Sequence, residues 1–423
     1  MKFFIRGGKK LSGEITVMGA KNAVLKAMAA SLLFETPVVL KNVPMIEDVS
    51  RMGELLGGLG ASIRGRGQGT IEIDPRGVKE SELKKEIAER LRASIVLVGP
   101  LLVRAGKAVF PHPGGCVIGR RPIDVFLDGW RAMGVEINEN KGNGFGASVK
   151  KLRGIDYTFR VVSVSGTETL MMTAALAEGK TVLRNAALEP EIPALASFLN
   201  ASGARIRGAG TPTIEIEGTG GKLLHAGEAF TAIPDRIEAG SFLILGAALA
   251  TGDGLMVSGC KPEHLAGVLA ALRDAGAGLD VGDDWVTVRR PEKLSAADMQ
   301  TREYPGFPTD VQAPFTVLMT QAEGESTVSE NIFENRFGYI EDLKKMGADI
   351  LLADPHRITV RGPTPLRGRE IESPDLRAGL AFVMAALLAE GESTISNVYQ
   401  IDRGYEKIDE RLRALGAEIQ RIE

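Results

Sequence analysis

The peptide LLAEGESTISN, residues 387–397, joins an apolar helical segment to a short strand through a tight turn. Apolar residues without a polar face precede the turn and β-branched residues follow it, which predicts a buried helix and then a strand. Related peptides are LLFETPVVLKN at 32–42, LLVRAGKAVFPH at 101–112, ALAEGKTVLRN at 175–185, ALATGDGLMVSG at 248–259 and TQAEGESTVSE at 320–330. Six copies of one phrase indicate an internal repeat.

A second phrase recurs with the same period. An amphipathic helical segment ends in Gly-Ala or Gly-Val, and a β-branched strand follows. Its glycines are Gly60, Gly134, Gly203, Gly276, Gly347 and Gly416, at intervals of 74, 69, 73, 71 and 69 residues. Glycine suits the left-handed residue that ends a helix. Each repeat of about 71 residues is therefore predicted to run helix, strand, helix, strand and usually one more strand.

The fold class predicted from this pattern is α/β. With 423 residues the chain exceeds the usual size of one hydrophobic core. We therefore expect two globular domains of three repeats each, joined near residues 221–233. The alternative is a solenoid that serves only as a binding scaffold. The apolar helices should lie inside, and the charged helices that end in glycine should lie outside.

Composition limits the classes of function. The net charge is −3, and no basic run with interleaved aromatic residues is present, so no nucleic-acid partner is expected. Apolar stretches are too short for a membrane span. Two cysteines, Cys116 and Cys260, cannot form a disulfide framework, which favours a cytoplasmic location. Zinc motifs and P-loops are absent, so neither a metal nor a cofactor is expected.

The starts of the apolar helices carry charge. Counting 14 residues back from each tight turn gives Lys21, Arg92, Ser165, Glu238, Asp310 and Arg377. Helix N-termini present unpaired N–H groups and partial positive charge, so cations are unfavourable there unless an anion binds. The pattern predicts a phosphate-binding centre. The alternative is that these are surface charges that happen to lie at helix starts.

The second repeat contains an insertion. Its segment from His112 to Gly134 spans 22 residues, whereas Asn42 to Gly60 spans 18. The added length lies in HPGGCVIGRRPID, residues 112–124. A glycine-rich loop with a cysteine beside two arginines is typical of a lid that carries a reactive thiol with a lowered pKa. We therefore expect Cys116 to be reactive and Cys260 to be a small buried apolar residue.

A set of motifs spans the chain in a fixed order. They are GAKNA (19–23), LRASI (91–95), PGGCVIGRRPID (113–124), EPEI (189–192), FPTDVQAPF (307–315), IFENRF (332–337), DLRAGL (375–380) and IDRGYEKID (401–409). With these motifs the chain resembles the enolpyruvyl transferase family, in particular the branch that acts on UDP-N-acetylglucosamine in peptidoglycan synthesis. The resemblance implies an inside-out α/β barrel fold, with domains of 22–233 and of 1–21 with 234–423. It also implies enolpyruvyl transfer from phosphoenolpyruvate to the sugar 3-hydroxyl, with release of phosphate.

The resemblance further implies the site. Around phosphoenolpyruvate it places Lys21, Asn22, Arg121, Arg377 and Arg403. At the nucleotide sugar it places Arg92, Arg121, Pro122, Ile123, Asp124, Val125, Val161, Val162, Ser163, Val164, Asp310 and Ile332. Cys116 would donate a proton to phosphoenolpyruvate and be the target of fosfomycin, and Asp310 would accept the hydroxyl proton. Lys21 and Arg403 would neutralise the charge that shifts during reaction.

Some positions depart from the family pattern. The family's Ser-Val-Gly-Ala-Thr run reads Ser-Val-Ser-Gly-Thr at 163–167, and Met18 stands where serine is usual. The hydroxyl of Ser165 is predicted to cap the third buried helix or to meet a phosphate. Two alternative functions are the same transfer to another uridine nucleotide, or to shikimate 3-phosphate. The second is disfavoured because the Cys116 loop belongs to the nucleotide-sugar branch. The sequence gives no oligomeric state.

Overall fold

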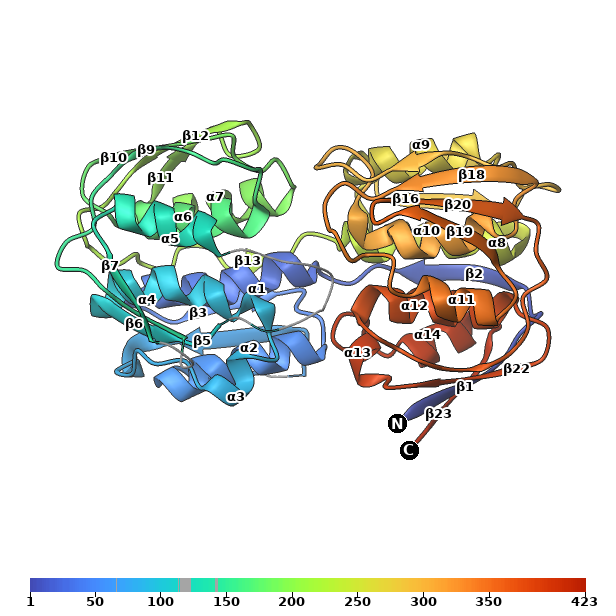
Figure 1. Ribbon diagram of the computed structural model, residues 1–423. Coiled ribbons are helices and arrows are strands. Elements are labelled where there is room, and N and C mark those ends of the chain that lie inside the picture. Colours follow the sequence, from blue (N-terminus) through green and yellow to red (C-terminus); the bar gives the residue numbers. More distant parts are fainter. Residues whose placement is uncertain (66, 113, 115–122, 141–143) are drawn as a thin grey trace. The chain divides into compact units, whose positions relative to one another are not determined.

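The computed structural model of the chain describes residues 1–423 except 66, 113, 115–122 and 141–143. The described residues divide into two compact units (Figure 1). One unit contains Met1–Met18 and Pro234–Glu423, and the other contains the described residues of 19–233. None of the helices in the described part of the chain has the length and apolarity needed to cross a bilayer.

The unit of residues 19–233 contains three repeats with the predicted succession of elements. The first has α1 (Lys21–Ala30), β3 (Val38–Lys41), α2 (Glu47–Leu59), β4 (Ser62–Arg64) and β5 (Thr70–Asp74). The second has η3 (Arg92–Leu97), α4 (Val98–Ala105), β6 (Lys107–Phe110), α5 (Asp124–Ala132), β7 (Glu136–Asn140) and β8 (Gly144–Ser148). The third has α6 (Val164–Ala175), β10 (Lys180–Arg184), α7 (Glu191–Ala201), β11 (Arg205–Arg207) and β12 (Thr213–Glu217). A short helix, α3 (Lys85–Ala88), precedes η3.

The other unit repeats this order. The fourth repeat has α8 (Arg236–Leu249), β14 (Ala250–Ser258), α9 (Ala266–Asp274), β15 (Gly278–Val281) and β16 (Trp285–Arg289). The fifth has η5 (Thr309–Val311), α10 (Gln312–Met319), β18 (Gly324–Ser329), α11 (Ile340–Lys345), β19 (Asp349–Asp354) and β20 (Arg357–Gly362). The sixth has α12 (Leu376–Leu388), β22 (Glu392–Ser396), α13 (Tyr399–Asp402), α14 (Ile408–Ala414) and β23 (Glu418–Ile422). The sheet of this repeat is completed by β1 (Lys2–Arg6), which lies between β22 and β23 and pairs antiparallel with both.

The six sheets in the described part of the chain follow one pairing pattern. In five of them, the strand after the apolar helix pairs antiparallel with one strand of the hairpin that closes the repeat, and in the sheet of the sixth repeat it pairs antiparallel with β1. A short strand pairs parallel on its other side in five sheets, and in the remaining sheet a single parallel bridge from Glu82 to Val109 takes its place. These short parallel strands are β2 (Leu11–Thr16), β9 (Asp156–Thr158), β13 (Phe230–Thr231), β17 (Met299–Gln300) and β21 (Glu370–Glu372).

Two of these short strands pair with a strand of a different repeat in the same unit. β9, β17 and β21 each precede a buried helix and pair with the strand that follows the same helix. In contrast, β2 precedes α1 but pairs with β14, and β13 precedes α8 but pairs with β3. Each unit therefore completes one of its sheets with a strand that lies far away in the sequence.

The glycines that close the outer helices confirm the repeat. Gly60, Gly134, Gly203, Gly276, Gly347 and Gly416 have φ of 107°, 95°, 101°, 85°, 111° and 103°. A side chain is strained at such angles, so glycine is required to end each helix and turn the chain into the next strand. The period of the sequence is thus a period of backbone conformation.

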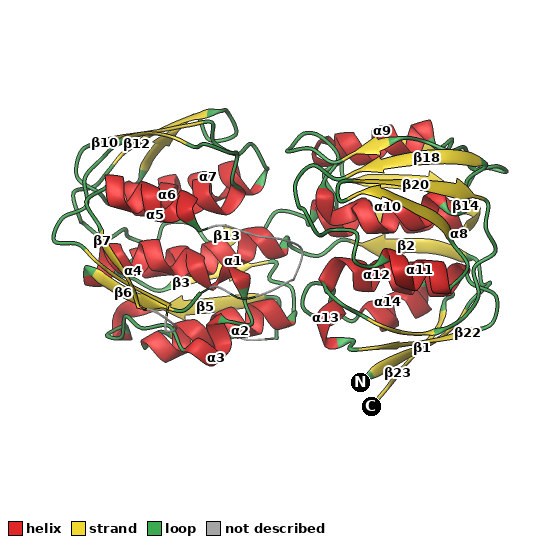
Figure 2. Cartoon of the chain, in the orientation of Figure 1, coloured by secondary structure: helices red, strands yellow, loops and turns green. Residues whose placement is uncertain are grey.

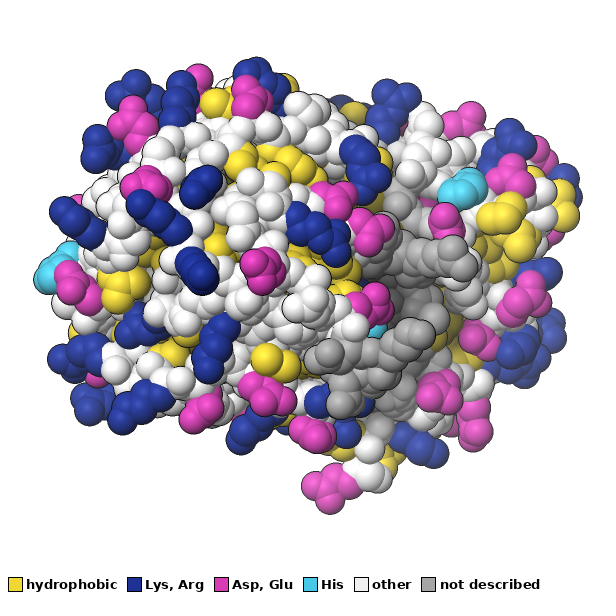
Figure 3. Space-filling view, turned by 60° about the vertical axis from the view of Figure 1, so that its left-hand side comes forward, with side chains coloured by type: hydrophobic (Ala, Val, Ile, Leu, Met, Phe, Trp, Pro, Cys, Tyr) yellow, Lys and Arg dark blue, Asp and Glu magenta, His cyan; other side chains and the backbone are white. Residues whose placement is uncertain are grey.

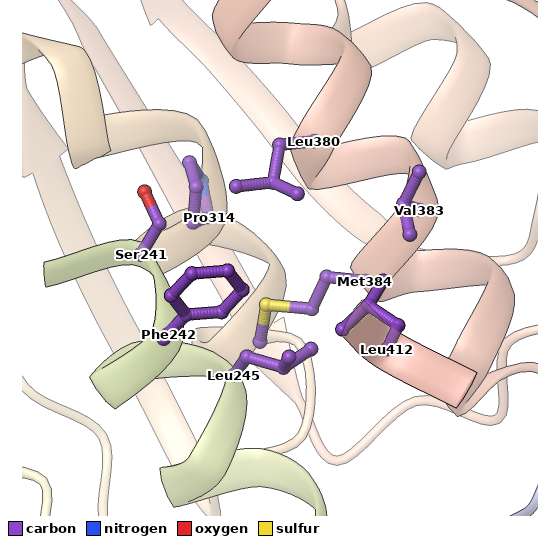
Figure 4. A pocket seen from close by; sticks show the side chains of 8 residues that line it. All are labelled: Ser241, Phe242, Leu245, Pro314, Leu380, Val383, Met384 and Leu412. Carbon is purple, nitrogen blue, oxygen red and sulfur yellow. The ribbon is translucent and has the colours of Figure 1, made fainter. Parts of the chain in front are cut away.

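The apolar helices lie inside their units, as predicted. In α8 every residue from Ile237 to Leu249 is buried, and in α12 every residue from Leu376 to Leu387 is buried. Figure 2 shows the apolar helices, such as α10 and α12, lying inside the sheets of their own unit. A small cavity is left between α8, α10, α12 and α14 (Figure 4), and its lining is apolar apart from Ser241, which donates to the carbonyl of Ile237. This cavity therefore has no group with which to bind a polar ligand.

A buried ion pair connects two inner helices. Lys26 of α1 lies 3.1 Å from a carboxylate oxygen of Glu168 in α6, and both side chains are at most 7% exposed. Burial raises the pKa of Glu168 to about 7, because the nearby Lys26 lowers it by less than burial raises it, while the charges of Glu189 and Glu191 raise it further. Between pH 4.5 and about 7, Glu168 is therefore protonated in the folded state but ionised in the unfolded chain. Stability from this proton is fully present below pH 4.5 and is lost as the pH rises through 7.

Removing Lys26 should destabilise the protein in a pH-dependent way. Lys26→Met leaves the Glu168 carboxylate buried without its cation, which typically costs about 3–5 kcal/mol. We expect the midpoint of thermal unfolding to fall more at pH 8 than at pH 5, since a protonated Glu168 needs no cation. The double variant Lys26→Met/Glu168→Leu should recover most of the loss. Equal losses at both pH values would contradict this assignment.

Candidate active site

Buried charges distinguish the candidate site from the surface. Figure 3 shows basic and acidic side chains interspersed over one face of the molecule. Many exposed charges pair with neighbours, as Arg184 does with Asp156 and Arg361 with Glu325. Burying a charge is costly unless it is paired, so buried charges are informative. Several of them lie near the starts of the apolar helices.

The positions obtained by counting back from the tight turns agree with the observed starts of the helices. Lys21, Arg92, Ser165, Glu238, Asp310 and Arg377 all lie within two residues of the first residue of α1, η3, α6, α8, η5 and α12. The residues that directly precede these helices differ in whether their side chains cap the helix N-terminus. Asp235 caps α8 and Asp375 caps α12 through their side chains, whereas α1, η3 and η5 follow Ala20, Leu91 and Pro308, which have no side-chain acceptor.

Asp310 lies at the centre of a cluster of arginines. Its Oδ1 accepts a hydrogen bond of 2.8 Å from Nη2 of Arg336, and its Oδ2 accepts one of 3.1 Å from Nη2 of Arg377. The Asp310 side chain is 27% exposed, whereas those of Arg336 and Arg377 are 4% and 7% exposed. Two buried cations thus hold one carboxylate that still reaches solvent. Two cations around one carboxylate leave a net positive charge, which attracts further anions.

Arg377 is held from its other side by an aromatic residue. Its Nη1 donates to the hydroxyl of Tyr405 at 3.2 Å, and its guanidinium lies 5.7 Å from the centre of that ring. The Tyr405 hydroxyl also lies 3.3 Å from the hydroxyl of Ser241. Burial alone would lower the pKa of Arg377, but the charge of Asp310 and its other neighbours raises it above its ordinary value. Arg377 therefore stays a cation while buried.

The remaining predicted residues of this unit lie on neighbouring elements. Arg403 follows α13, is 8% exposed and donates to Oε1 of Gln400 at 3.0 Å. Ile332 follows β18, and its amide is held by the carboxylate of Glu330. Sequence reasoning missed Arg336 and Tyr405 as partners of the site. Both lie inside quoted motifs, IFENRF and IDRGYEKID, but nothing in the sequence indicates which carboxylate or cation they contact.

Glu238 is tied down at the start of α8. Its carboxylate accepts from Nη1 of Arg411 at 2.6 Å and from the amide of Met18 at 2.7 Å. Burial raises its pKa, and the charge of Arg411 opposes that effect. Glu238 therefore has a structural role at this helix start, because its carboxylate connects Met18, at the end of the N-terminal segment, to α8.

In the unit of residues 19–233, Lys21 and Asn22 open α1. Lys21 Nζ lies 3.0 Å from Oδ2 of Asp48, and their side chains are 12% and 4% exposed. Arg92 opens η3 in the same unit. Because α1 begins without a side-chain cap or an acidic first turn, its N–H groups and Lys21 favour an anion at the same end.

Two predicted nucleotide-sugar segments meet at Gly166. A Cβ on Gly166 would lie 2.9 Å from Oγ of Ser163 and 3.0 Å from Cγ1 of Val125. The hydroxyl of Tyr157 also donates to the carbonyl of Val125. Glycine at 166 thus permits close approach of the segment Ile123, Asp124 and Val125 to the segment Val161, Val162, Ser163 and Val164.

The expected cap by Ser165 is wrong. Ser163 is the N-cap of α6, and its Oγ accepts a hydrogen bond of 3.1 Å from the amide of Gly166. The helix begins at Val164, one residue earlier than the count placed it, so Ser165 already lies in the first turn. Val161 is 59% exposed and free of helix and strand.

Three predicted site residues, Cys116, Arg121 and Pro122, lie outside the described residues. Cys260 is buried, as expected, and burial raises the pKa of its thiol to about 11. It is therefore an unreactive apolar residue. Within the described ranges no group of three or more His, Cys, Asp or Glu side chains is placed to hold a metal ion.

Comparison with known proteins places this arrangement in a family. Residues 5–412 match the family described as EPSP synthase (3-phosphoshikimate 1-carboxyvinyltransferase). All of the chain aligns at 45% identity with 99% of the UDP-N-acetylglucosamine 1-carboxyvinyltransferase of Desulforapulum autotrophicum, and at 48% with 96% of that of Acidobacterium capsulatum. Of the solved structures, the enolpyruvyl transferase NikO from Streptomyces tendae superposes with a TM-score of 0.89 at 27% identity, covering 99% of this chain and 98% of that chain.

The repeated α/β fold and the full-length matches define an enzyme that transfers an enolpyruvyl group. The chain belongs to the enolpyruvyl transferase family, and relatives 44–48% identical to it carry the name UDP-N-acetylglucosamine 1-carboxyvinyltransferase.

The Asp310 cluster makes a prediction about stability. Arg336→Met removes a buried donor to a carboxylate, and hydrogen bonds to charged groups contribute about 1.5–3 kcal/mol. Arg357→Met, which breaks the exposed pair with Asp354, should change the free energy of unfolding by less than about 1 kcal/mol. Thermal unfolding of both variants measures the difference. Equal effects would mean that Arg336 does not hold Asp310 in solution.

Proposed function

We propose that the chain transfers the enolpyruvyl group of phosphoenolpyruvate to the 3-hydroxyl of UDP-N-acetylglucosamine and releases phosphate. The observation that carries this proposal is the set of full-length relatives with that name. The Asp310 cluster supports it, because a partly exposed carboxylate among buried cations suits a reaction between an anionic substrate and a hydroxyl group.

The proposed reaction is an addition followed by an elimination. The sugar oxygen bonds to C2 of phosphoenolpyruvate while Asp310 accepts the hydroxyl proton and Cys116 donates a proton to C3. The tetrahedral product then returns a proton from C3 to the Cys116 thiolate, the C2–C3 double bond forms again, and the bond from C2 to the phosphate oxygen breaks. Lys21, Asn22, Arg121, Arg377 and Arg403 would stabilise the negative charges of phosphoenolpyruvate and of the departing phosphate.

The nucleotide sugar has its own proposed contacts. They are Arg92, Arg121, Pro122, Ile123, Asp124, Val125, Val161, Val162, Ser163, Val164, Asp310 and Ile332. The close approach at Gly166 supports a shared role for the segments 123–125 and 161–164. Since Val161 has no charge, backbone groups and the arginines would provide most of the polar contacts.

Arg377 has a carboxylate partner in the structure and a second, proposed anionic partner in the substrate. In the structure it donates to Oδ2 of Asp310, and an anionic substrate would compete for the same donor. Arg336 would keep its bond to Oδ1, so the carboxylate would stay oriented while Oδ2 became available to accept the hydroxyl proton. Binding of phosphoenolpyruvate would thereby prepare Asp310 to act as the base.

A phosphate-release assay tests the function. Phosphate is expected only when phosphoenolpyruvate and UDP-N-acetylglucosamine are both present. UMP, UDP-glucose and shikimate 3-phosphate are offered in turn as alternative acceptors. Faster turnover of another uridine nucleotide would favour the paralogous transfer, and turnover of shikimate 3-phosphate would favour the other branch of the family.

Cys116 variants test the proton donor. Cys116→Asp should keep substantial turnover and resist fosfomycin, because a carboxylic acid can donate a proton but does not react as a thiolate does. Cys116→Ala should lose most of its activity. Cys260→Ala is the matched control, since its buried thiol should have no part in turnover. If Cys116→Ala is as active as the wild type across the pH range, Cys116 is not the proton donor.

We further propose a cellular role and a finer description of the fold. Each unit would be an inside-out α/β barrel, and the domains would follow the division of 22–233 from 1–21 with 234–423. The enzyme would act in the cytoplasm at the first committed step of peptidoglycan synthesis, and so support cell-wall formation, cell shape and division. It would use small-molecule substrates without a metal or cofactor, and without nucleic-acid or membrane partners.

A further inference from the structure

Glu330 is a buried carboxylate that follows β18 and is surrounded by donors. The residue is 0% exposed. Its Oε1 accepts from the hydroxyl of Thr301 at 3.0 Å and from the amides of Ile332 and Phe333 at 2.8 and 3.1 Å. Its Oε2 accepts from the hydroxyl of Thr309 at 2.8 Å. Four donors therefore compensate the burial of this charge.

The backbone of Glu330 is fixed as well. Its amide donates to the carbonyl of His356 at 2.8 Å, and its carbonyl lies 2.9 Å from Nδ1 of the same histidine. His356 lies in the turn between β19 and β20 of the same sheet. The carboxylate thus has a defined position relative to the sheet and serves as a rigid acceptor for the surrounding loops.

The loops that Glu330 holds carry the Asp310 cluster. Thr309 directly precedes Asp310, and Ile332 and Phe333 begin the segment that brings Arg336 to Asp310. Arg336 also reaches the carbonyl of Thr309 at 3.4 Å. One carboxylate therefore fixes both sides of the ion pair, the turn that carries the base and the loop that carries its cation.

We propose that Glu330 is a positioning residue for the proposed base Asp310. It touches the reacting groups only through Thr309 and through the loop of Ile332 and Arg336. It sets the direction in which the Asp310 carboxylate faces the sugar hydroxyl, and it orients the backbone at Ile332. This inference rests on the proposed function, because Asp310 needs a direction only if it accepts a proton there.

Two threonine variants separate positioning from general stability. Thr309→Val and Thr301→Val each remove one hydroxyl that donates to Glu330, with little change in volume. Thr301 also accepts from the amide of Asn331 at 2.9 Å, so its loss breaks two hydrogen bonds. A purely structural role of Glu330 predicts the larger effect for Thr301→Val on every measurement. Positioning predicts that Thr309→Val lowers kcat more, although it destabilises the protein less.

A third variant changes the acceptor itself. Glu330→Gln keeps the shape but presents an amide NH₂ to donors on one side. Small misplacement of a reacting group can cost about 100-fold in rate, so we expect kcat to fall by roughly 10- to 100-fold. The KM for phosphoenolpyruvate should change much less, whereas the KM for UDP-N-acetylglucosamine should rise moderately, because Glu330 holds the amide of the proposed contact Ile332. Glu325→Gln is the matched control, because Glu325 lies on β18, the strand that leads to Glu330, and forms an exposed pair with Arg361.

The experiment measures kcat, both KM values and the thermal midpoint for the wild type and these four variants. A larger fall in kcat for Thr309→Val than for Thr301→Val supports positioning. Equal kcat for Glu330→Gln and wild type, or effects on kcat that follow the thermal midpoints, overturn it. If the wild type is active only with another uridine nucleotide, the comparison is made with that acceptor, and only the proposed substrate is wrong. A wild type that releases no phosphate with any acceptor overturns both proposals.

Discussion

The structure depends on one constraint, which is that its inner helices are apolar on every side. The helix α12 is buried from Leu376 to Leu387, and α8 from Ile237 to Leu249. A helix with no polar face must be covered all round, and a single sheet covers only one side of it. Three sheets in each unit meet this need, with outer helices that have only one apolar face. Each of the three repeats in a unit contributes one of these sheets.

The same constraint places the chemistry at the helix starts. Along their length the inner helices have no room for charges, apart from compensated pairs such as Lys26 with Glu168. At their first turns, backbone N–H groups need partners, and buried side chains can meet them there. Asp235, Asp375 and Ser163 satisfy three of these starts internally. The uncapped starts carry Lys21, Arg92 and Asp310, which are residues proposed to contact substrates.

Local features could be predicted from the sequence, and long-range pairings could not. The period of the glycines, the burial of Cys260 and the helix starts follow from residue type and spacing. The partners of Asp310 could not be predicted, because Arg336 and Arg377 lie 26 and 67 residues away and many other arginines were available. The cap of α6 was wrongly assigned to Ser165, because Ser163 competes for the same position and only backbone geometry selects between them. The pairing of β2 with β14 and of β13 with β3 could not be predicted either, because composition does not show which strands pair.

The position of β1 has a consequence for biosynthesis. Its residues Lys2–Arg6 pair with strands at 392–396 and 418–422, so this inner strand of the sheet leaves the ribosome long before its two neighbours. β2 likewise waits for β14. Residues 19–233, in contrast, contain every strand that their own sheets need. This half can fold while translation continues, whereas β2 stays unpaired until β14 has been made, and β1 until β22 and β23 have been made. Unpaired strands invite association with other chains, so the nascent protein is most vulnerable through β1 and β2.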